Sequence, residues 1–372
     1  MTTGFRAVPE GWLWLGLVCL AVWPTLASFH GVWTSYTYSH GYLAAAVAVW
    51  FGWRHLRDGL PGEGVDEVSW AGFVIVGLSL VWLVATVLHL RVVHQGVLPL
   101  MLVAWAGMAG GIKGARAAAP AAWLALFAIP FWEAFVPPLQ ALTVMVSGTV
   151  VDLMGIGAEI SENVIAIPSG RFEVAGSCSG LNYFIVGSFL GSTYAYLFVD
   201  RARTRLQVIA LAAITAMLAN WVRVVGLVVI GHVTEMQHSL MTSHHAYGWV
   251  VFALFMGAWL WGVERRSGRN VRASAQSVRE TSHAQGGWGR QSYLATGLVL
   301  IGPAIYWLVT AIPAQPIDTY ASEFSPRDGW LEERVGAETV EWGPEYPGAD
   351  LHERAVLSRD SVTIFVDRVT FL

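Results

Sequence analysis

The sequence predicts an all-α polytopic membrane protein with about nine transmembrane helices. Hydrophobic residues make up 55% of the 372 residues and charged residues only 13%, whereas soluble domains carry about 25% charged residues. Nineteen tryptophans are present, and apolar runs long enough to cross a bilayer recur along the chain. The net charge of −4 indicates no particular partner, and we find no basic patch that would predict nucleic-acid binding.

Each expected span is an apolar run of about 20 residues, the length that crosses the hydrocarbon core of a bilayer. The first run lacks a small-residue cleavage site after its apolar stretch, so we expect a retained helix rather than a signal peptide. Gly and Pro interrupt the fourth and fifth runs. The nine expected spans are 10–28, 39–55, 69–88, 95–112, 117–136, 178–199, 206–231, 245–263 and 292–312.

Arginine and lysine predict the orientation of these spans. The short loops on one side carry only Arg91 and Arg171, and the remaining loop cations fall on the other side. Because cytoplasmic loops are enriched in Lys and Arg, we expect a cytoplasmic N-terminus, a periplasmic C-terminus and periplasmic loops at 137–177 and 232–244. The expected cytoplasmic cations are Arg6, Arg54, Arg57, Lys113, Arg116, Arg201, Arg203, Arg205, Arg265, Arg266, Arg269, Arg272, Arg279 and Arg290.

The segments outside the spans also have distinct compositions. Residues 266–291 are polar and rich in Gly and Ser, which predicts a flexible cytoplasmic linker. Residues 313–372 have soluble composition with strand-like runs, so we expect a small α+β periplasmic tail. In the outer loop, 137–157 has the spacing of an amphipathic helix lying on the membrane surface. Two β-rich runs within 163–175 predict a hairpin that leads into Cys178.

Cys178 stands in a run of small residues, "VAGSCSGLNY". If a helix begins at Ser177 or Cys178, its free N–H groups and dipole favour a thiolate and could donate to an oxyanion. The neighbours Ser179 and Gly180 would let a substrate backbone approach. The alternative is an inert cysteine in a helix cap, and with Cys19 as the only other cysteine no disulfide framework is expected.

Asn220 and Arg223 lie three residues apart in "NWVRVVG", so they share one helix face. An Arg within a membrane span is costly and is by default a candidate functional residue. Its guanidinium suits a carboxylate or an oxyanion. The alternative is an Arg that reaches outward to water or pairs with Glu133 or Glu173.

Three histidines lie at the outer ends of expected spans. His244 and His245 occur in "TSHHAYGWVVF" and His40 in "SYTYSHGYL". Histidine can act as base and then acid near neutral pH, although a histidine at a span end is often a polar interfacial residue. The three histidines and Cys178 come from separate helices without a recognisable zinc spacing. The sequence therefore predicts no metal and no cofactor.

The predicted topology does not depend on these residues, yet it places Cys178, Arg223, His244 and His40 at one membrane face. A thiol, an imidazole and a fixed cation at one depth predict a cysteine transpeptidase or protease. Two alternatives remain. One is a multi-pass transporter, which would place polar groups near the midplane with repeat symmetry. The other is a membrane acyltransferase or glycan-processing enzyme that does not use the thiol.

In this order, the motifs "GSCSGLNY" (176–183), "NWVRVVG" (220–226) and "HHAYGWVVF" (244–252) resemble those of the exosortases, bacterial inner-membrane cysteine-type transpeptidases that sort proteins. "YSHGYL", "PPLQ" and "IPSGRFEVAGSCSG" also match the family pattern. The resemblance covers about residues 10–265. We assign residues 1–265 to a membrane catalytic core, and 292–312 would be an additional transmembrane helix.

The resemblance implies a role for each matching residue. Cys178 would be the nucleophile that forms a thioester, and Arg223, supported by Asn220, would stabilise the oxyanion. His244 would match the family histidine, four residues before the Gly of the Gly-Trp pair. The family often has an acidic residue just before this histidine, where this chain has a serine, so His245 is a possible substitute.

The resemblance also implies partners and location. Family substrates are exported proteins with a C-terminal PEP-CTERM signal, which combines a Pro-Glu-Pro motif, an apolar helix and a basic cluster. The acceptor that resolves the thioester could be water, an amine or a lipid, and membrane lipid surrounds the protein. A bacterial inner-membrane location and a link to exopolysaccharide assembly follow. Residues 340–369 are similar to the exosortase-associated domain sometimes fused after exosortase A, and we assign the tail no catalysis.

Overall fold

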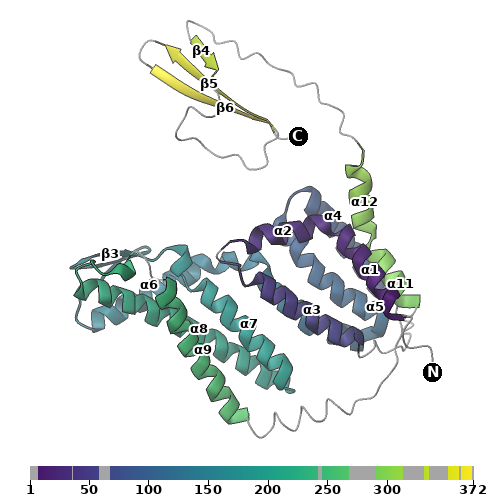
Figure 1. Ribbon diagram of the computed structural model, residues 1–372, viewed down its shortest axis with the longest axis horizontal. Helices are drawn as coiled ribbons and strands as arrows, with labels where there is room; N and C mark the ends of the chain where they lie inside the picture. The colour runs from purple at the N-terminus through teal and green to yellow at the C-terminus, as the bar shows by residue number, and fades with distance from the viewer. Residues whose placement is uncertain are drawn as a thin grey trace. The chain divides into compact units, whose positions relative to one another are not determined.

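The computed structural model describes residues 7–35, 37–57, 68–241, 245–267, 290–312, 331–334, 351–359 and 362–370. The chain divides into two compact units, Met1–Ile312 and Pro313–Leu372 (Figure 1). The helices of the first unit are α1 (Ala7–Ala21), α2 (Trp23–Trp33), α3 (Gly41–Arg57), α4 (Val68–Val87), α5 (Arg91–Ala125), α6 (Val136–Leu153), α7 (Leu181–Phe198), α8 (Ala202–Val233), α9 (His245–Ser267), α11 (Arg290–Val299) and α12 (Ile301–Thr310), with short 3₁₀ turns η1 (Leu126–Ala128), η2 (Pro130–Phe135), η3 (Gly176–Cys178) and η4 (Ser239–Met241).

Within the described residues, five helical segments are long and apolar enough to cross a membrane, and Ala71–Val87 is a shorter apolar helix. A mostly helical protein with several membrane-spanning segments is therefore confirmed, whereas the count of nine spans and their orientation stay predictions. The five segments are Arg91–Ala128, Pro130–Leu153, Ala202–Val233, Ala246–Arg266 and Gln291–Thr310.

The expectation of one continuous first span, 10–28, is wrong. Helix α1 ends at Ala21 and α2 begins at Trp23. Pro24 stands in the first turn of α2. Proline is tolerated there because the first N–H groups of a helix have no partner within the helix, but the same proline could not have continued α1.

The expected span 95–112 and the first part of the expected span 117–136 lie in one long element, α5, whereas the end of 117–136 forms η1, η2 and the start of α6. Backbone dihedrals leave the helical region at Gly110–Gly111, where the second glycine has a φ of +62°, a conformation that favours glycine. A Cβ on Gly114 would clash with the carbonyl oxygen of Ala106. The chain therefore folds back at the glycine pair, and the two halves are separate segments joined by a tight turn.

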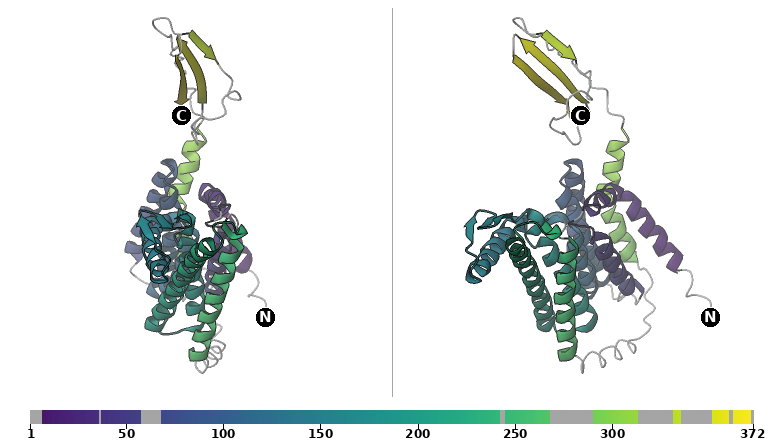
Figure 2. Two further views of the ribbon diagram at one scale, coloured as in Figure 1. Left: turned by 90° about the vertical axis from the view of Figure 1, so that its left-hand side faces the viewer. Right: turned by 60° about the vertical axis from the view of Figure 1, so that its left-hand side comes forward.

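Helices α7, α8 and α9 pack together, and α8 contacts both of the others (Figures 1 and 2). Gly187 and Gly191 of α7 face Ala216 and Ala212 of α8, and a Cβ on either glycine would lie 2.5 Å from the facing alanine methyl. Small residues four apart let two membrane helices approach closely. This close contact fixes α7, which begins just after Cys178, against α8, which carries Arg223.

The helix before the tail packs into the first unit through a specific contact with α4. The Ser79 hydroxyl donates to the Val299 carbonyl at 2.9 Å and accepts from the backbone N–H of Gly302 at 2.7 Å. A Cβ on Gly302 would clash with the Ser79 carbonyl oxygen. The segment 290–312 is thus an integral part of the helical unit.

The segment between α5 and α7 contains a helix and a hairpin close to the expected positions, and a strand that the sequence did not predict. Helix α6 covers most of 137–157, but Pro130–Leu153 is one of the candidate membrane spans, so a location on the membrane surface stays a prediction. Strands β2 (Val164–Ile167) and β3 (Gly170–Glu173) pair antiparallel, which confirms the hairpin, and β1 (Glu159–Ser161) adds a third strand beside β2. The Ser169 hydroxyl and the His232 Nδ1 are hydrogen-bonded at 3.1 Å, so the hairpin turn lies at the end of α8.

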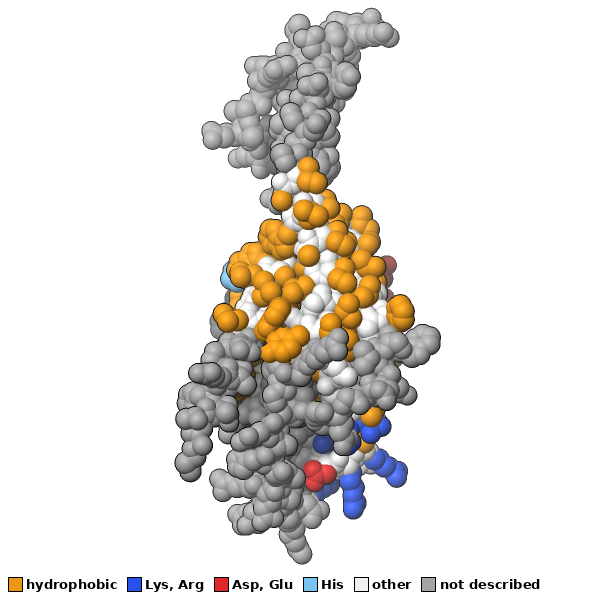
Figure 3. All heavy atoms as spheres, turned by 90° about the vertical axis from the view of Figure 1, so that its right-hand side faces the viewer, with side chains coloured by type: hydrophobic (Ala, Val, Ile, Leu, Met, Phe, Trp, Pro, Cys, Tyr) orange, Lys and Arg blue, Asp and Glu red, His pale blue; other side chains and the backbone are white. Residues whose placement is uncertain are grey.

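Basic side chains gather at one end of the helical unit. Figure 3 shows apolar side chains over the middle of one face, with Lys and Arg side chains below them. The guanidinium of Arg205 lies 5.2 Å from the Tyr196 ring centroid, and that of Arg265 lies 3.9 Å from Trp261. Aromatic rings and cations of this kind are enriched at membrane–water interfaces. This end therefore has the chemistry that we predicted for the cytoplasmic side.

The second unit contains the antiparallel sheet β4 (Leu331–Arg334), β5 (Leu351–Arg359) and β6 (Val362–Thr370), with β5 in the centre. The run "DSVTIFVD", which predicted a strand, falls on β6. The predicted linker, 266–291, lies almost wholly outside the described residues.

Candidate active site

The chain reaches Cys178 through a 3₁₀ turn rather than a helix start. Helix α7 begins at Leu181, so the expectation that it begins at Ser177 or Cys178 is wrong. The N–H of Cys178 donates to the Ala175 carbonyl at 2.8 Å and is therefore not free. The residue between turn and helix, Gly180, has a φ of +95°, which a residue with a side chain rarely adopts.

Three side chains from other helices hold the backbone on both sides of the thiol. Thr143 of α6 donates to the Ser179 carbonyl at 2.9 Å, and Asn220 of α8 donates through Nδ2 to the Cys178 carbonyl at 3.1 Å. Gln140, also on α6, donates to the carbonyl of Val174. Thr143, Ser179 and Asn220 are fully buried. Since buried carbonyls need donors, these bonds define where the thiol sits.

Arg223 of α8 lies beside the thiol. Its Nη2 is 3.9 Å from the Cys178 sulfur, and the residue is only 6% exposed. Its Nε has no hydrogen-bond partner among the described residues. The expected alternative was a pairing with Glu133 or Glu173, but no ion pair to either is found in the described part of the chain, and Glu173 instead accepts from Asn163 at 3.1 Å. A buried guanidinium with an unused donor is suited to an incoming oxyanion.

Tyr183 connects the three helices that surround the site. The Arg223 guanidinium lies 5.7 Å from its ring centroid, and the ring packs on Phe252 of α9 with 4.9 Å between centroids. The hydroxyl donates to the Gly248 carbonyl. A Cβ on Gly248 would lie 2.8 Å from both the Arg223 Nε and the Tyr183 hydroxyl. The Gly of the Gly-Trp pair therefore lets α9 approach the arginine.

Of the three candidate histidines, the structure describes the side chain of His40 alone. His244 lies outside the described residues, and for His245 only the backbone is described, at the first position of α9. His40 lies in the turn before α3. Its Nε2 is hydrogen-bonded to the Phe127 carbonyl at 3.0 Å, and burial lowers the pKa of its imidazole. This bond ties the turn to η1 and gives His40 a structural role at the edge of the site.

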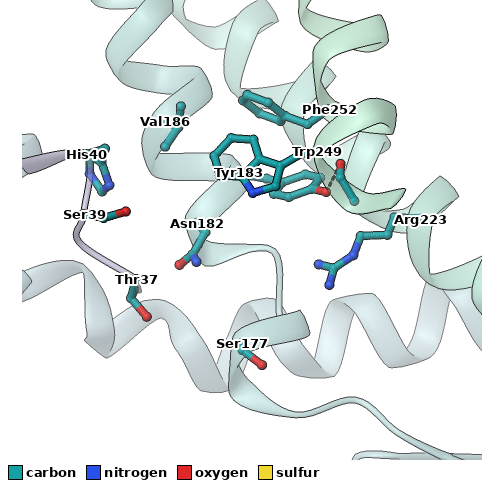
Figure 4. A pocket seen from close by; sticks show the side chains of 11 residues that line it. Thr37, Ser39, His40, Ser177, Asn182, Tyr183, Val186, Arg223, Trp249 and Phe252 are labelled. Atoms are coloured by element: carbon teal, nitrogen blue, oxygen red, sulfur yellow. Dashed lines mark hydrogen bonds between the residues drawn. The ribbon is translucent and has the colours of Figure 1, made fainter. Parts of the chain in front are cut away.

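A pocket opens beside Arg223 and is lined from both sides of α7 (Figure 4). It encloses about 610 Å³ of empty space, including its open mouth. Ser177, which precedes the thiol, and Arg223 lie at one end, and His40 lies across the pocket from Arg223 in Figure 4. The remaining lining residues are Thr37, Ser39, Asn182, Tyr183, Val186, Gly248, Trp249 and Phe252.

Sequence reasoning missed several of these residues. Tyr183 was quoted within a motif but assigned no role, although this tyrosine, five residues after the cysteine, contacts both Arg223 and α9. Thr37 and Asn182 lie within quoted motifs, but nothing in their residue type or spacing predicted that they line a pocket. Ser179 and Gly180, which we expected to admit a substrate, shape the turn before α7, and their contact with a substrate stays a prediction. The Ser179 hydroxyl accepts from the Leu181 N–H at 3.3 Å.

A thiol in contact with a buried arginine, next to a pocket that the arginine lines, is compatible with more than one class of protein, and the comparison with known families identifies the class. The sequence model of the transmembrane exosortase family matches residues 32–261, more than half of the chain. The chain belongs to the exosortase family. Membership implies a membrane-embedded protease or transpeptidase that acts on exported proteins bearing sorting signals. Searches of curated proteins and of solved structures found no match.

The matched region contains every residue of the candidate site described above and excludes α11, α12 and the tail. Within the described residues, no group of three or more His, Cys, Asp or Glu side chains could hold a metal ion.

Proposed function

We propose that this exosortase cleaves the C-terminal PEP-CTERM signal of exported proteins at the periplasmic face of a bacterial inner membrane, through a thioester on Cys178. This proposal rests on the contact between Cys178 and Arg223. A guanidinium 3.9 Å from the sulfur could stabilise the negative charge that a carbonyl oxygen gains during attack by that sulfur, and its Nε has no hydrogen-bond partner among the residues that the structure describes.

In the first step the Cys178 sulfur attacks the scissile carbonyl carbon, and the carbonyl oxygen becomes an oxyanion next to Arg223. Preorganised donors in a site that excludes water stabilise such charge strongly. The C–N bond then breaks, the departing amine takes a proton, and an acyl thioester remains on Cys178. His244 is the proposed proton carrier, with His245 as its alternative.

In the second step an acceptor attacks the thioester and frees the thiol. Water would make the overall reaction hydrolysis, whereas an amine or a lipid hydroxyl would make it a transpeptidation or transfer. The link to exopolysaccharide and envelope assembly is part of the same proposal and rests on the family resemblance alone.

The test is processing of a reporter that carries a PEP-CTERM signal, in cells that express the wild type, Cys178→Ala or Cys19→Ala at matched membrane levels. Cys19 is the matched control because it is the only other cysteine and lies in α1, away from the pocket lining. We expect Cys178→Ala alone to stop signal removal. Normal processing by Cys178→Ala would contradict a thioester mechanism and favour a transporter or a non-thiol enzyme.

A further inference from the structure

Helix α7 uses one side to pack against the N-terminal helices. Leu181, Ile185 and Phe189 are buried in a cluster with α3 and with the end of α5. These positions are four apart and lie on one helix face. Tyr196 continues the same side, with its ring centroid 6.4 Å from that of Phe51 in α3. One side of α7 is thus covered by the end of α5, η1 and η2, with α3 beside them.

A second side of α7 packs against α9. The Tyr194 ring lies 5.8 Å from that of Trp259, as the Tyr183 ring lies close to Phe252 nearer the outer end. Helix α8 covers the back, where the two glycines of α7 meet its alanines. At 100° per residue, the described residues leave one sector of α7 uncovered, located between the α3 side and the α9 side.

That sector is a strip of five residues, Asn182, Val186, Leu190, Thr193 and Leu197, which we call the α7 strip. Their spacing of three or four residues places them on one face. Leu190 and Leu197 are each 37% exposed, and the other three are partly exposed. The Thr193 hydroxyl already donates to the Phe189 carbonyl at 2.9 Å. Beyond Asn182 the strip therefore offers apolar surface without an unpaired polar group.

The pocket is the outer end of this strip. Its lining combines the first two strip residues, Asn182 and Val186, with His40 from the α3 side and Trp249 from the α9 side. Figure 4 shows Asn182 and Val186 between His40 on one hand and Trp249 on the other. The strip is thus continuous with the pocket that holds Arg223, and it lies between the same two flanking elements.

We propose that the α7 strip binds the apolar transmembrane helix of the substrate. This inference rests on the proposed function, which supplies a substrate with such a helix. The strip runs from Asn182 to Leu197, about 22 Å at 1.5 Å per residue, within a bilayer core of about 30 Å. A helix lying along the strip places the residues just outside the membrane in the pocket beside Arg223 and Cys178.

The occupant is a membrane helix rather than a soluble segment because the strip lies on a helix without charged residues, packed against α8 and near α9, both of which are candidate membrane spans. Binding there aligns the cleavage point with the thiol, since the depth of the substrate helix in the membrane fixes which residues reach the pocket.

The test is site-specific photo-crosslinking. A benzophenone amino acid replaces Leu190 on the strip or, as a matched control, Leu218 on the exposed side of α8. Leu218 has comparable exposure, 42%. Both are made in the Cys178→Ala enzyme, so that the reporter with its apolar helix stays uncleaved. We expect a crosslink to the reporter from position 190 and none above background from position 218.

A second pair of variants, Leu190→Trp and Leu218→Trp, is made with Cys178 intact. We expect Leu190→Trp to lose most reporter processing and Leu218→Trp to retain it. If the wild type processes the reporter but position 190 gives no crosslink, or the two positions crosslink equally, the strip is not the binding site although the function stands. A crosslink from position 190 to a second copy of this chain would likewise overturn the inference. If the wild type does not process the reporter, both proposals fail.

Discussion

Replacing Gly180 with alanine tests whether the backbone around the thiol controls activity. Gly180 has a φ of +95°, and its added Cβ would lie 2.9 Å from the Asn220 Nδ2 and 3.0 Å from the Met217 Cε. The left-handed conformation costs a non-glycine residue about 1–2 kcal/mol. The side chain of Asn220 would also have to move away from the Cys178 carbonyl that it holds.

Losing that hydrogen bond adds about 0.5–1.5 kcal/mol, so the substitution disfavours the observed turn by roughly 1.5–3.5 kcal/mol in total. Because 1.36 kcal/mol corresponds to a tenfold change in rate, we expect reporter processing to fall by roughly 10- to 400-fold. The substitution should lower activity by displacing the thiol. The protein should still fold and reach the membrane, because no core side chain is removed.

The assay compares Gly180→Ala with Gly176→Ala in the reporter cells, with membrane levels matched by immunoblot. A Cβ on Gly176 would lie 3.4 Å from a Val136 methyl, an ordinary contact, so this control carries the same change in the same motif without the same cost. Equal processing by the two variants would refute the reasoning, because it would show that the turn does not depend on the conformation of Gly180.

The remaining predictions concern other contacts of the helical unit. Arg223→Lys keeps the charge but loses the planar fork, and we expect reporter processing to fall roughly 100-fold, the cost of one oxyanion donor; a rate close to that of the wild type would exclude an oxyanion role. Tyr183→Phe keeps the ring but loses its hydrogen bond to α9, which should cost about 0.5–1.5 kcal/mol and lower both the melting temperature in detergent and the processing rate; unchanged values would leave the tyrosine without a positioning role. Gly302→Ala should cost about 1–3 kcal/mol by overpacking against Ser79, whereas Gly297→Ala, with open space around it, should leave the melting temperature unchanged or raise it; similar melting temperatures would argue against tight docking of α12.

Much of the fold was accessible from the sequence because its strongest signals are compositional. Apolar runs located the long helices, and β-rich runs around a Pro-Ser-Gly turn located the hairpin of β2 and β3. Strand β1 was missed because its three residues, "EIS", are too few to form a pattern. The break before α2 could have been predicted, since Pro24 is a signal for a helix start.

The site was only partly accessible. Helical spacing predicted that Asn220 and Arg223 share one face, and the predicted topology placed that face at the same depth as Cys178. The 3.9 Å contact between Arg223 and the thiol agrees with both predictions. The start of α7 was misplaced because a run of small residues is compatible with both a helix cap and a 3₁₀ turn. The hydrogen bonds of the Ser179 backbone and side chain decide between these two structures, and no pattern in the sequence reveals them.

The three hydrogen-bond donors around Cys178 limit which substitutions the protein can tolerate during evolution. Gln140, Thr143 and Asn220 donate to main-chain carbonyls, so these bonds do not depend on the side chains of the residues that carry the carbonyls, although Cys178 itself is fixed by its proposed role as the nucleophile. The donors cannot be exchanged in the same way, because losing one leaves a buried carbonyl unpaired. Motifs some forty residues before and after the thiol are therefore constrained as one unit. Chimeras between related enzymes should work only when α6, the 3₁₀ turn and α8 are taken from the same parent.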